Sequence, residues 1–254
     1  MVPRQIVLMT DFGCDGIYTA QLESLLYSVC EDIRVITLFT RLPAFNIQAA
    51  AYLLPAYTPY FPATTIFICV VDPGVGSERP AVLIKADEQW FIGPDNGLFE
   101  LIKRRASTVK IWHIDVALLQ LHGKLALQPS YSFHGRDIFA PLAVALAKNC
   151  LPPLQSIEQD YREEGWPDEW PVIIYIDAYG NLISGLRGSA VEKTAALQLK
   201  GCRCPRVNTF SEVLQGQPLC YMNANGLLEI AVNGGSAANF FTAKVGDLLS
   251  LVTD

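Results

Sequence analysis

Short apolar runs alternate with amphipathic stretches over residues 1–150. The runs are rich in β-branched and aromatic residues, which is typical of buried strands, and they cover residues 6–9, 32–39, 66–71, 81–86, 90–92 and 109–114. Between the first two runs, apolar residues recur at helical spacing, at Tyr18, Leu22, Leu25, Leu26 and Val29. Further helices are predicted at 46–54, 98–104 and 138–148. This alternation predicts an α/β domain in which helices cover a mostly parallel sheet.

Two residues mark expected helix ends. Asp15 is placed to cap the first helix, because its carboxylate can accept hydrogen bonds from free backbone N–H groups. Pro55 is expected to stop the helix over 46–54, since proline lacks the N–H that continues a helix.

The pattern changes after residue 150. Residues 151–170 are rich in Pro, Trp and acidic residues, and we expect a linker there. Beyond it the helical spacing disappears, and short apolar runs are separated by Gly, Asn and Pro turns, at 172–177, 180–186, 195–199, 227–232 and 248–252. The sequence therefore predicts domains at 1–150 and 171–254, the second smaller and all-β.

Composition excludes several classes of protein. Of the 254 residues, 51% are hydrophobic and 17% charged, so the chain is globular. The net charge of −6 and a single short basic run, Lys103-Arg104-Arg105, argue against nucleic acid as a partner. No apolar run reaches the roughly 18–20 residues that a membrane span requires.

The seven cysteines are scattered, with no Cys-x-x-Cys pair. Neither they nor the histidines have the spacing of metal ligands, so no metal site is predicted. Together with an N-terminus that lacks a signal-peptide pattern, reduced cysteines favour a cytoplasmic location.

Candidate chemistry begins where the run over 66–71 ends. Asp72 and Arg79 follow it, and Asp11 follows the first run in the same way. Ligands of α/β sheets bind at the carboxyl ends of strands, so these residues are candidates for a site. The alternative is a tight turn with a solvated Asp–Arg pair. His134 precedes a predicted helix, whose amino end attracts negative charge.

Six motifs resemble those of the S-adenosylmethionine (SAM) hydroxide adenosyltransferases, which are related to the SAM-dependent fluorinase and chlorinase. They lie in the family's order along nearly the whole chain: Thr10-Asp11-Phe12-Gly13, Val71-Asp72-Pro73-Gly74-Val75-Gly76-Ser77-Glu78-Arg79, Gly93-Pro94-Asp95-Asn96-Gly97-Leu98, Phe133-His134-Gly135-Arg136-Asp137-Ile138-Phe139-Ala140-Pro141, Ile176-Asp177-Ala178-Tyr179-Gly180-Asn181-Leu182-Ile183 and Asn225-Gly226-Leu227-Leu228-Glu229-Ile230-Ala231.

The resemblance implies an N-terminal α/β domain and a C-terminal β-barrel domain. It implies a homotrimer in which each substrate lies between the N-terminal domain of one subunit and the C-terminal domain of its neighbour. The implied reaction is attack of water on the ribose C5′ of SAM, which releases adenosine and methionine without a cofactor.

The resemblance also assigns site residues. Asp72, Arg79 and His134 fall on the water-activating triad, and Asp11 on the carboxylate that holds the ribose hydroxyls. The other substrate contacts fall on Phe45 (packing), Asp177 (the methionine amino group), Tyr179 and Asn181 (around the adenine), and the backbone of Val232 and Gly234 (the adenine edge).

This chain departs from the pattern at two places. It has Thr40-Arg41-Leu42 where the family often has Thr-His-Glu. The methionine carboxylate contact falls on Ala224-Asn225, where the halogenating branch carries Ser-Arg.

Two alternative functions stay open. One is a SAM-dependent halide transferase, although Val75 stands where halogenating relatives carry a hydroxyl side chain. The other is a SAM- or adenosine-binding protein without turnover. For the hydrolase, we expect Asp72 to orient the water and Arg79 to fix Asp72. Because an adjacent arginine weakens a carboxylate as a base, we expect His134 to accept the proton.

Overall fold

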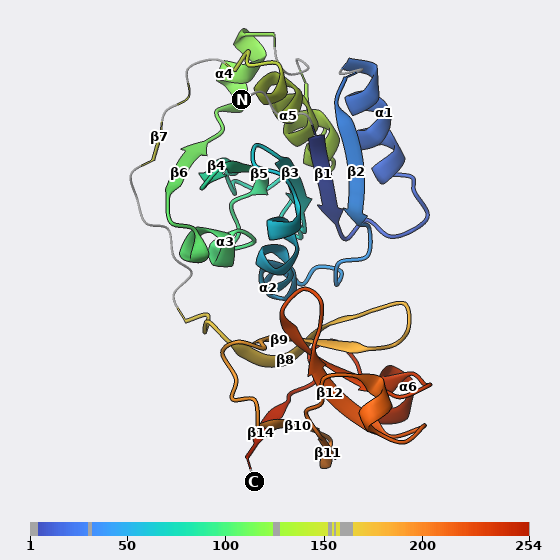
Figure 1. The fold of residues 1–254 in the computed structure, drawn as a ribbon. Helices are drawn as coiled ribbons and strands as arrows, with labels where there is room; N and C mark the ends of the chain where they lie inside the picture. The colour runs from blue at the N-terminus through green and yellow to red at the C-terminus, as the bar shows by residue number, and fades with distance from the viewer. Residues whose placement is uncertain are drawn as a thin grey trace. The chain divides into compact units, whose positions relative to one another are not determined.

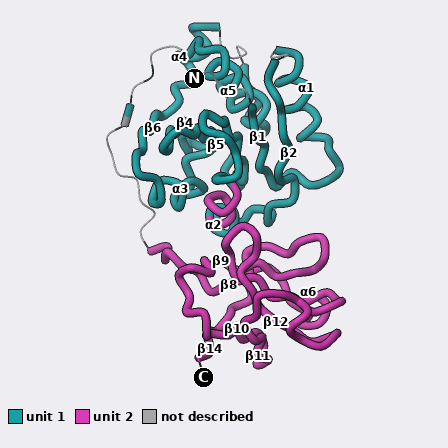
Figure 2. Tube along the Cα trace, in the orientation of Figure 1, with its two compact units in different colours: residues 1–51, 58–163 teal, residues 52–57, 164–254 magenta. Residues whose placement is uncertain are grey.

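The computed structural model describes residues 5–29, 32–123, 128–151, 154, 156–157 and 165–253. The chain forms two compact units (Figure 2), residues 1–51 with 58–163 and residues 52–57 with 164–254. Half of the predicted linker, 151–170, lies outside the described residues, so the predicted boundaries stay predictions.

Unit 1 is built on one seven-stranded sheet with the order β2-β1-β3-β5-β4-β6-β7 (Figure 1). Its strands are β1 (Gln5–Thr10), β2 (Arg34–Phe39), β3 (Ile66–Val70), β4 (Ala81–Ala86), β5 (Gln89–Pro94), β6 (Val109–His113) and β7 (Ser156–Ile157). The β2-β1-β3-β5 part is parallel, whereas the pairs β5–β4, β4–β6 and β6–β7 are antiparallel. The predicted α/β class is confirmed, with a mixed sheet.

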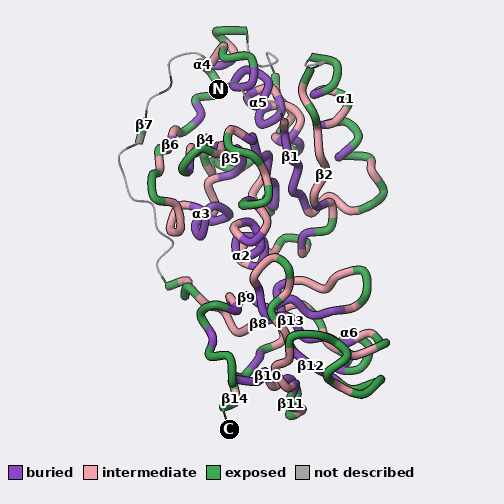
Figure 3. The backbone as a smooth tube through the Cα atoms, viewed as in Figure 1, coloured by how far each residue is buried: buried purple, intermediate pink, exposed green. Residues whose placement is uncertain are grey.

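Helices accompany this sheet because its central strands, β1 and β3, are apolar and buried along nearly their whole length. They are α1 (Thr19–Val29), α2 (Ile47–Tyr57), α3 (Glu100–Arg105), α4 (Val116–Leu121) and α5 (Ala140–Ala147). Ile66 and Ile68 of β3 pack in one core with Leu22 and Leu26 of α1 and with α5. Phe67 of the same strand is also fully buried and stacks on the ring of Phe91 at 5.0 Å. Figure 3 shows this buried centre along β1, β3 and α5.

Two local expectations are wrong. Helix α1 begins at Thr19, four residues after Asp15, so Asp15 does not cap it. Helix α2 continues through Pro55 to Tyr57. Proline removes one hydrogen bond near the end of a helix, and the full burial of Leu53 and Leu54 holds the last turn in place.

Unit 2 contains two antiparallel sheets, β12-β13-β9-β8 and β11-β10-β14. The strands are β8 (Trp170–Ile176), β9 (Leu182–Arg187), β10 (Ala196–Leu199), β11 (Cys202–Cys204), β12 (Pro218–Met222), β13 (Leu227–Val232) and β14 (Ser250–Val252), with a short helix α6 (Ala237–Phe241). Single bridges between Val172 and Leu248 and between Arg206 and Cys220 join the edges of the two sheets. The strands therefore run around one shared core, as expected of a barrel-like domain.

The sequence pattern missed β11 and β12 in unit 2. Strand β11 has three residues, too few to show a period, and β12 begins with Pro218 directly after a polar loop. In the described part of the chain, no helix combines the length and apolar character needed to cross a bilayer.

Candidate active site

The first candidate site lies where the order of the strands reverses. The chain places β2 on one side of β1 and then β3 on the other, so β1 and β3 flank a switch point. The two strands are parallel and in register from Ile6 opposite Ile66 to Thr10 opposite Val70. Asp11 and Asp72 therefore leave the same edge of the sheet, where α/β folds bind ligands.

Asp72, Arg79 and His134 form one connected cluster. Arg79 binds the Asp72 carboxylate through two N–H groups: Nε donates to Oδ1 at 2.9 Å, and Nη2 donates to Oδ2. The same Nη2 lies 2.8 Å from Nδ1 of His134, which is 55 residues further along the chain. The side chains of Asp72 and Arg79 are only 4% and 11% exposed, so this is a buried ion pair rather than the solvated turn considered from the sequence.

The direction of the Arg79–His134 bond follows from chemistry. A guanidinium can only donate, so Nδ1 of His134 accepts, and the neutral ring then carries its proton on Nε2. Burial, and then the charge of Arg79, lower the pKa of His134 below its usual 6.5. Both effects favour the neutral ring.

Local backbone structure presents His134 to the site. It immediately precedes a single π-helical turn, Gly135–Phe139, which leads into α5. Such turns are rare and are frequent at functional sites. Gly135 begins this turn close to the rings of Phe12 and Phe133, since an added Cβ would lie 3.4 Å from an atom of each ring.

Asp11 and Phe45 are joined by a hydrogen bond near this cluster. Oδ2 of Asp11 accepts the backbone N–H of Phe45 at 3.0 Å. Phe45 has a φ of 60°, an uncommon value for a non-glycine residue, and its side chain is 75% exposed. Burial raises the pKa of Asp11, and the nearby charge of Asp72 acts in the same direction.

These groups surround a cavity of about 320 Å³. Asp11, Phe45, Asp72 and His134 line it, together with Val75 and a group of mutually packed aromatic rings. The structure thus brings together the five site residues predicted in the N-terminal domain, with Arg79 reaching the cavity through its bonds to Asp72 and His134.

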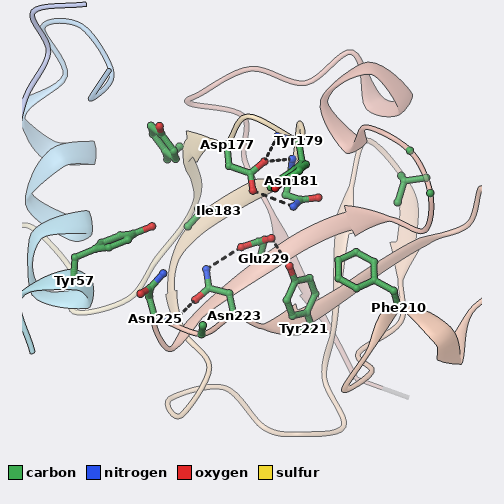
Figure 4. A pocket seen from close by; sticks show the side chains of 15 residues that line it. Tyr57, Asp177, Tyr179, Asn181, Ile183, Phe210, Tyr221, Asn223, Asn225 and Glu229 are labelled. Carbon is green, nitrogen blue, oxygen red and sulfur yellow. Dashed lines mark hydrogen bonds between the residues drawn. The ribbon is translucent and has the colours of Figure 1, made fainter. Parts of the chain in front are cut away.

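A second cavity, of about 840 Å³, lies in unit 2 (Figure 4). All six site residues predicted in the C-terminal domain line it: Asp177, Tyr179, Asn181, Asn225, Val232 and Gly234.

The Asp177 carboxylate organises the turn after β8. Oδ1 accepts the backbone N–H groups of Tyr179 and Asn181, both at 2.9 Å, and Oδ2 accepts Nδ2 of Asn181 at 3.0 Å. Gly180 between them has a φ of 84°, and a Cβ there would meet the side chain of Ser236 at 2.1 Å. The turn leaves the Tyr179 side chain 81% exposed while Asn181 is buried.

Sequence reasoning missed five polar residues that line this cavity: Tyr57, Tyr175, Tyr221, Asn223 and Glu229. Glu229 is only 4% exposed. It accepts the hydroxyl of Tyr221 and, at 2.9 Å, Nδ2 of Asn223 (Figure 4). A signal was present, because Glu229 is the one charged residue inside the apolar strand Leu227–Val232.

Burial sets the acidity of these groups. It raises the pKa of Glu229, with Asp177 adding to the effect, and raises the pKa of Tyr57 to about 12. Among the described residues, no three His, Cys, Asp or Glu side chains gather in a group that could hold a metal ion.

Comparison with known proteins agrees with this arrangement over both units. Residues 6–157 match the SAM hydroxide adenosyltransferase N-terminal domain, and residues 172–250 match the C-terminal domain of the same family. The chain therefore belongs to the SAM hydroxide adenosyltransferase family.

Individual relatives span the whole chain. It is 34% identical to an (R)-S-adenosyl-L-methionine hydrolase of Thermus thermophilus, covering 96% of this chain and 97% of the relative. It is 31% identical to the protein of the same name from Salinispora tropica, covering 96% of each. Fluorinases are more distant, at 21% identity for that of Actinopolyspora mzabensis over 95% of this chain and 94% of the fluorinase. An uncharacterized conserved protein from Thermotoga maritima has a similar structure, with a TM-score of 0.84 and 25% identity over 97% of this chain and all of the other.

Proposed function

We propose that this protein hydrolyses S-adenosyl-L-methionine at the ribose C5′ and releases adenosine and L-methionine. The observation that carries the proposal is the Asp72–Arg79–His134 cluster beside a cavity at the β1/β3 switch point. Relatives named (R)-S-adenosyl-L-methionine hydrolase, matched over nearly their whole length, support it. Val75 in the lining favours water over a halide as nucleophile, because it offers no hydroxyl group.

Hydrolysis of SAM at C5′ requires an activated nucleophile, because sulfur is already a good leaving group. The water oxygen forms a bond to C5′, the C5′–S bond breaks, and its electron pair leaves with sulfur as the neutral thioether of methionine. No acid is needed for the leaving group. Free hydroxide at pH 7 would cost about 12 kcal/mol, at about 1.36 kcal/mol per pH unit from a water pKa of about 15.7. Proton removal during attack, together with in-line positioning worth about 7–11 kcal/mol, lowers that demand.

The hydrogen bonds of the cluster revise the roles that we assign from the sequence. His134 uses the lone pair of Nδ1 for Arg79, so a neutral His134 has no free lone pair for a proton. Its Nε2–H can instead donate to the attacking oxygen. A carboxylate accepts about four hydrogen bonds, and Arg79 occupies two positions on Asp72. We therefore assign proton acceptance to Asp72, orientation of the water to His134, and alignment of both to Arg79.

The remaining predicted residues hold the substrate. Asp11 binds the ribose hydroxyls and Phe45 packs on the substrate, both in the cavity of unit 1. In the cavity of unit 2, Tyr179, Asn181 and the backbone of Val232 and Gly234 surround the adenine, while Asp177 and Asn225 meet the amino-acid part. We propose a homotrimer in which the two cavities that share one substrate come from neighbouring subunits. The protein works in the cytoplasm and needs no cofactor.

One incubation tests the reaction. SAM is incubated with the protein in water enriched in ¹⁸O, and the products are separated by chromatography and weighed by mass spectrometry. We expect adenosine with the label in its 5′-hydroxyl and unlabelled methionine. A 5′-halo-nucleoside formed in added chloride or fluoride would replace the proposal with the transferase. SAM binding by calorimetry without any product would replace it with a binding protein. Sedimentation analysis tests the trimer.

A further inference from the structure

The cavity of unit 2 carries acidic groups without a balancing cation. Asp177 and Glu229 line it, and none of its described lining residues is Lys, Arg or His. The rest of the lining is mostly aromatic and amide side chains, with Tyr175, Tyr179, Tyr221 and Phe210 among them. Such a cavity attracts a positively charged group and disfavours an anion.

Two other carboxylates with buried side chains, among the described residues, are paired with cations. Asp72 is paired with Arg79, and the fully buried Glu100 is paired with Lys103 and Arg104. In the described part of the chain, no cationic side chain forms an ion pair with Glu229, whose partners are the neutral donors Tyr221 and Asn223. The Glu229 carboxylate therefore lacks a cationic partner among the described residues, and a cation on a ligand would supply the one that a buried carboxylate needs.

Glu229 is better placed than Asp177 to bind that ligand. Asp177 already accepts three N–H groups from its own turn. Glu229 accepts one hydrogen bond on each oxygen, which leaves about two acceptor positions free on its carboxylate. Asn223 also fixes it, since Oδ1 of Asn223 accepts the backbone N–H groups of Asn225 and Leu227 while Nδ2 holds Glu229.

We propose that Glu229 binds the ammonium group of the substrate and makes this cavity select its substrate by the amino group rather than by the carboxylate. The inference rests on the proposed function and extends it to a substrate class: adenosyl sulfonium compounds with a primary amine on the chain, whether or not a carboxylate is present. Decarboxylated SAM, which keeps the amine and lacks the carboxylate, is then a substrate. Deaminated SAM, which keeps only the carboxylate, is a poor one.

The test compares these two analogues with SAM as substrates of the full-length protein, by the kcat/KM for adenosine release. A site built around a polar group strongly rejects analogues that lack it. We expect decarboxylated SAM to be preferred over deaminated SAM by at least about 100-fold, and Glu229→Gln to reduce that preference at least about tenfold. The matched control is Glu88→Gln, which removes one carboxylate from an exposed pair with Lys85 and should leave the preference unchanged.

Each outcome decides the inference. A wild-type preference below tenfold, or one for the deaminated compound, overturns it, and an unchanged preference in folded Glu229→Gln removes Glu229 from the role. If Glu229→Gln does not fold, Tyr221→Phe replaces it in the test. Tyr221→Phe frees one oxygen of Glu229 and keeps the carboxylate, so this variant must retain the preference for decarboxylated SAM.

Failure of the proposed function has a different signature, because the wild-type protein then releases no adenosine from SAM. In that event calorimetry with the same ligands applies the same criterion. Tighter binding of decarboxylated than of deaminated SAM supports the inference, and equal or absent binding overturns it.

Discussion

Replacing Asp72 with asparagine removes one negative charge from the centre of the cluster with almost no change in shape. The carboxylate is 4% exposed and receives two N–H groups from Arg79. An asparagine keeps one acceptor oxygen and turns an NH₂ group toward the other guanidinium N–H. It leaves the largely buried cation of Arg79 unpaired.

Two magnitudes follow from this geometry. Breaking a buried ion pair by removing one partner costs about 3–5 kcal/mol in the free energy of unfolding. Arg79 keeps contacts with His134 and the carbonyl of Pro80, so we expect the lower end, about 3 kcal/mol. Loss of the proton acceptor should lower kcat for adenosine release by at least about 100-fold.

The assay combines urea unfolding followed by circular dichroism with chromatographic measurement of adenosine at saturating SAM. Glu88→Gln is the control, since an exposed pair contributes about 0–1 kcal/mol. If folded Asp72→Asn turns over within about tenfold of the parent protein, Asp72 is not the base, and the hydrogen-bond argument that moved this role from His134 is wrong.

Three further predictions concern the same unit. His134→Gln keeps an N–H donor where His134→Ala has none, so the glutamine variant should retain at least about tenfold more kcat, and equal losses in both would contradict a donor role. Because folding lowers the pKa of His134 below 6.5, its neutral form contributes stability above pH 6.5 that is lost as pH falls toward the folded-state value. Thermal unfolding at pH 5–8 should therefore show the wild-type protein losing more stability below about pH 6.5 than His134→Gln, and parallel curves would refute this. Gly76→Ala should lower the free energy of unfolding, measured in urea, by about 1–3 kcal/mol, because Gly76 has a φ of 81° and a Cβ would lie 2.5 Å from the carbonyl oxygen of Tyr131. The control is Gly123→Ala, since Gly123 has a φ of 64° and open space around it. This variant should show only the smaller cost of the positive φ.

Much of the fold follows from local pattern. The runs at 6–9, 66–71 and 81–86 become β1, β3 and β4, because continuous apolar β-branched residues suit only a strand covered on both faces. The sequence pattern gave the wrong helix end where tertiary packing overrides the local preference of the chain. The burial of Leu53 and Leu54 carries α2 through Pro55 to Tyr57, whereas propensity alone predicts that the helix stops before Pro55.

The candidate site was found through strand ends and motif order. Asp11 and Asp72 each follow a parallel strand, and the pairing of β1 with β3 brings them to one edge. Glu229 lies within the last of the six motifs, but the resemblance assigns it no site role. Its significance depends on which groups face it, and those come from β12 and the loop before β13 rather than from its own strand.

By itself, the sequence determined the fold class, the family resemblance and the residue types that the chemistry requires. These are properties of short stretches, in which periodicity, turn residues and motif order can be read directly. Only the tertiary structure decided which groups donate and which accept. The bond from Arg79 to Nδ1 of His134 joins residues 55 positions apart and is the basis for our assignment of proton acceptance to Asp72. The absence of a cation among the described lining residues is the basis for the ligand that we propose for Glu229. Hydrogen-bond direction and uncompensated charge arise from partners that the folded chain brings together, so no pattern along the sequence contains them.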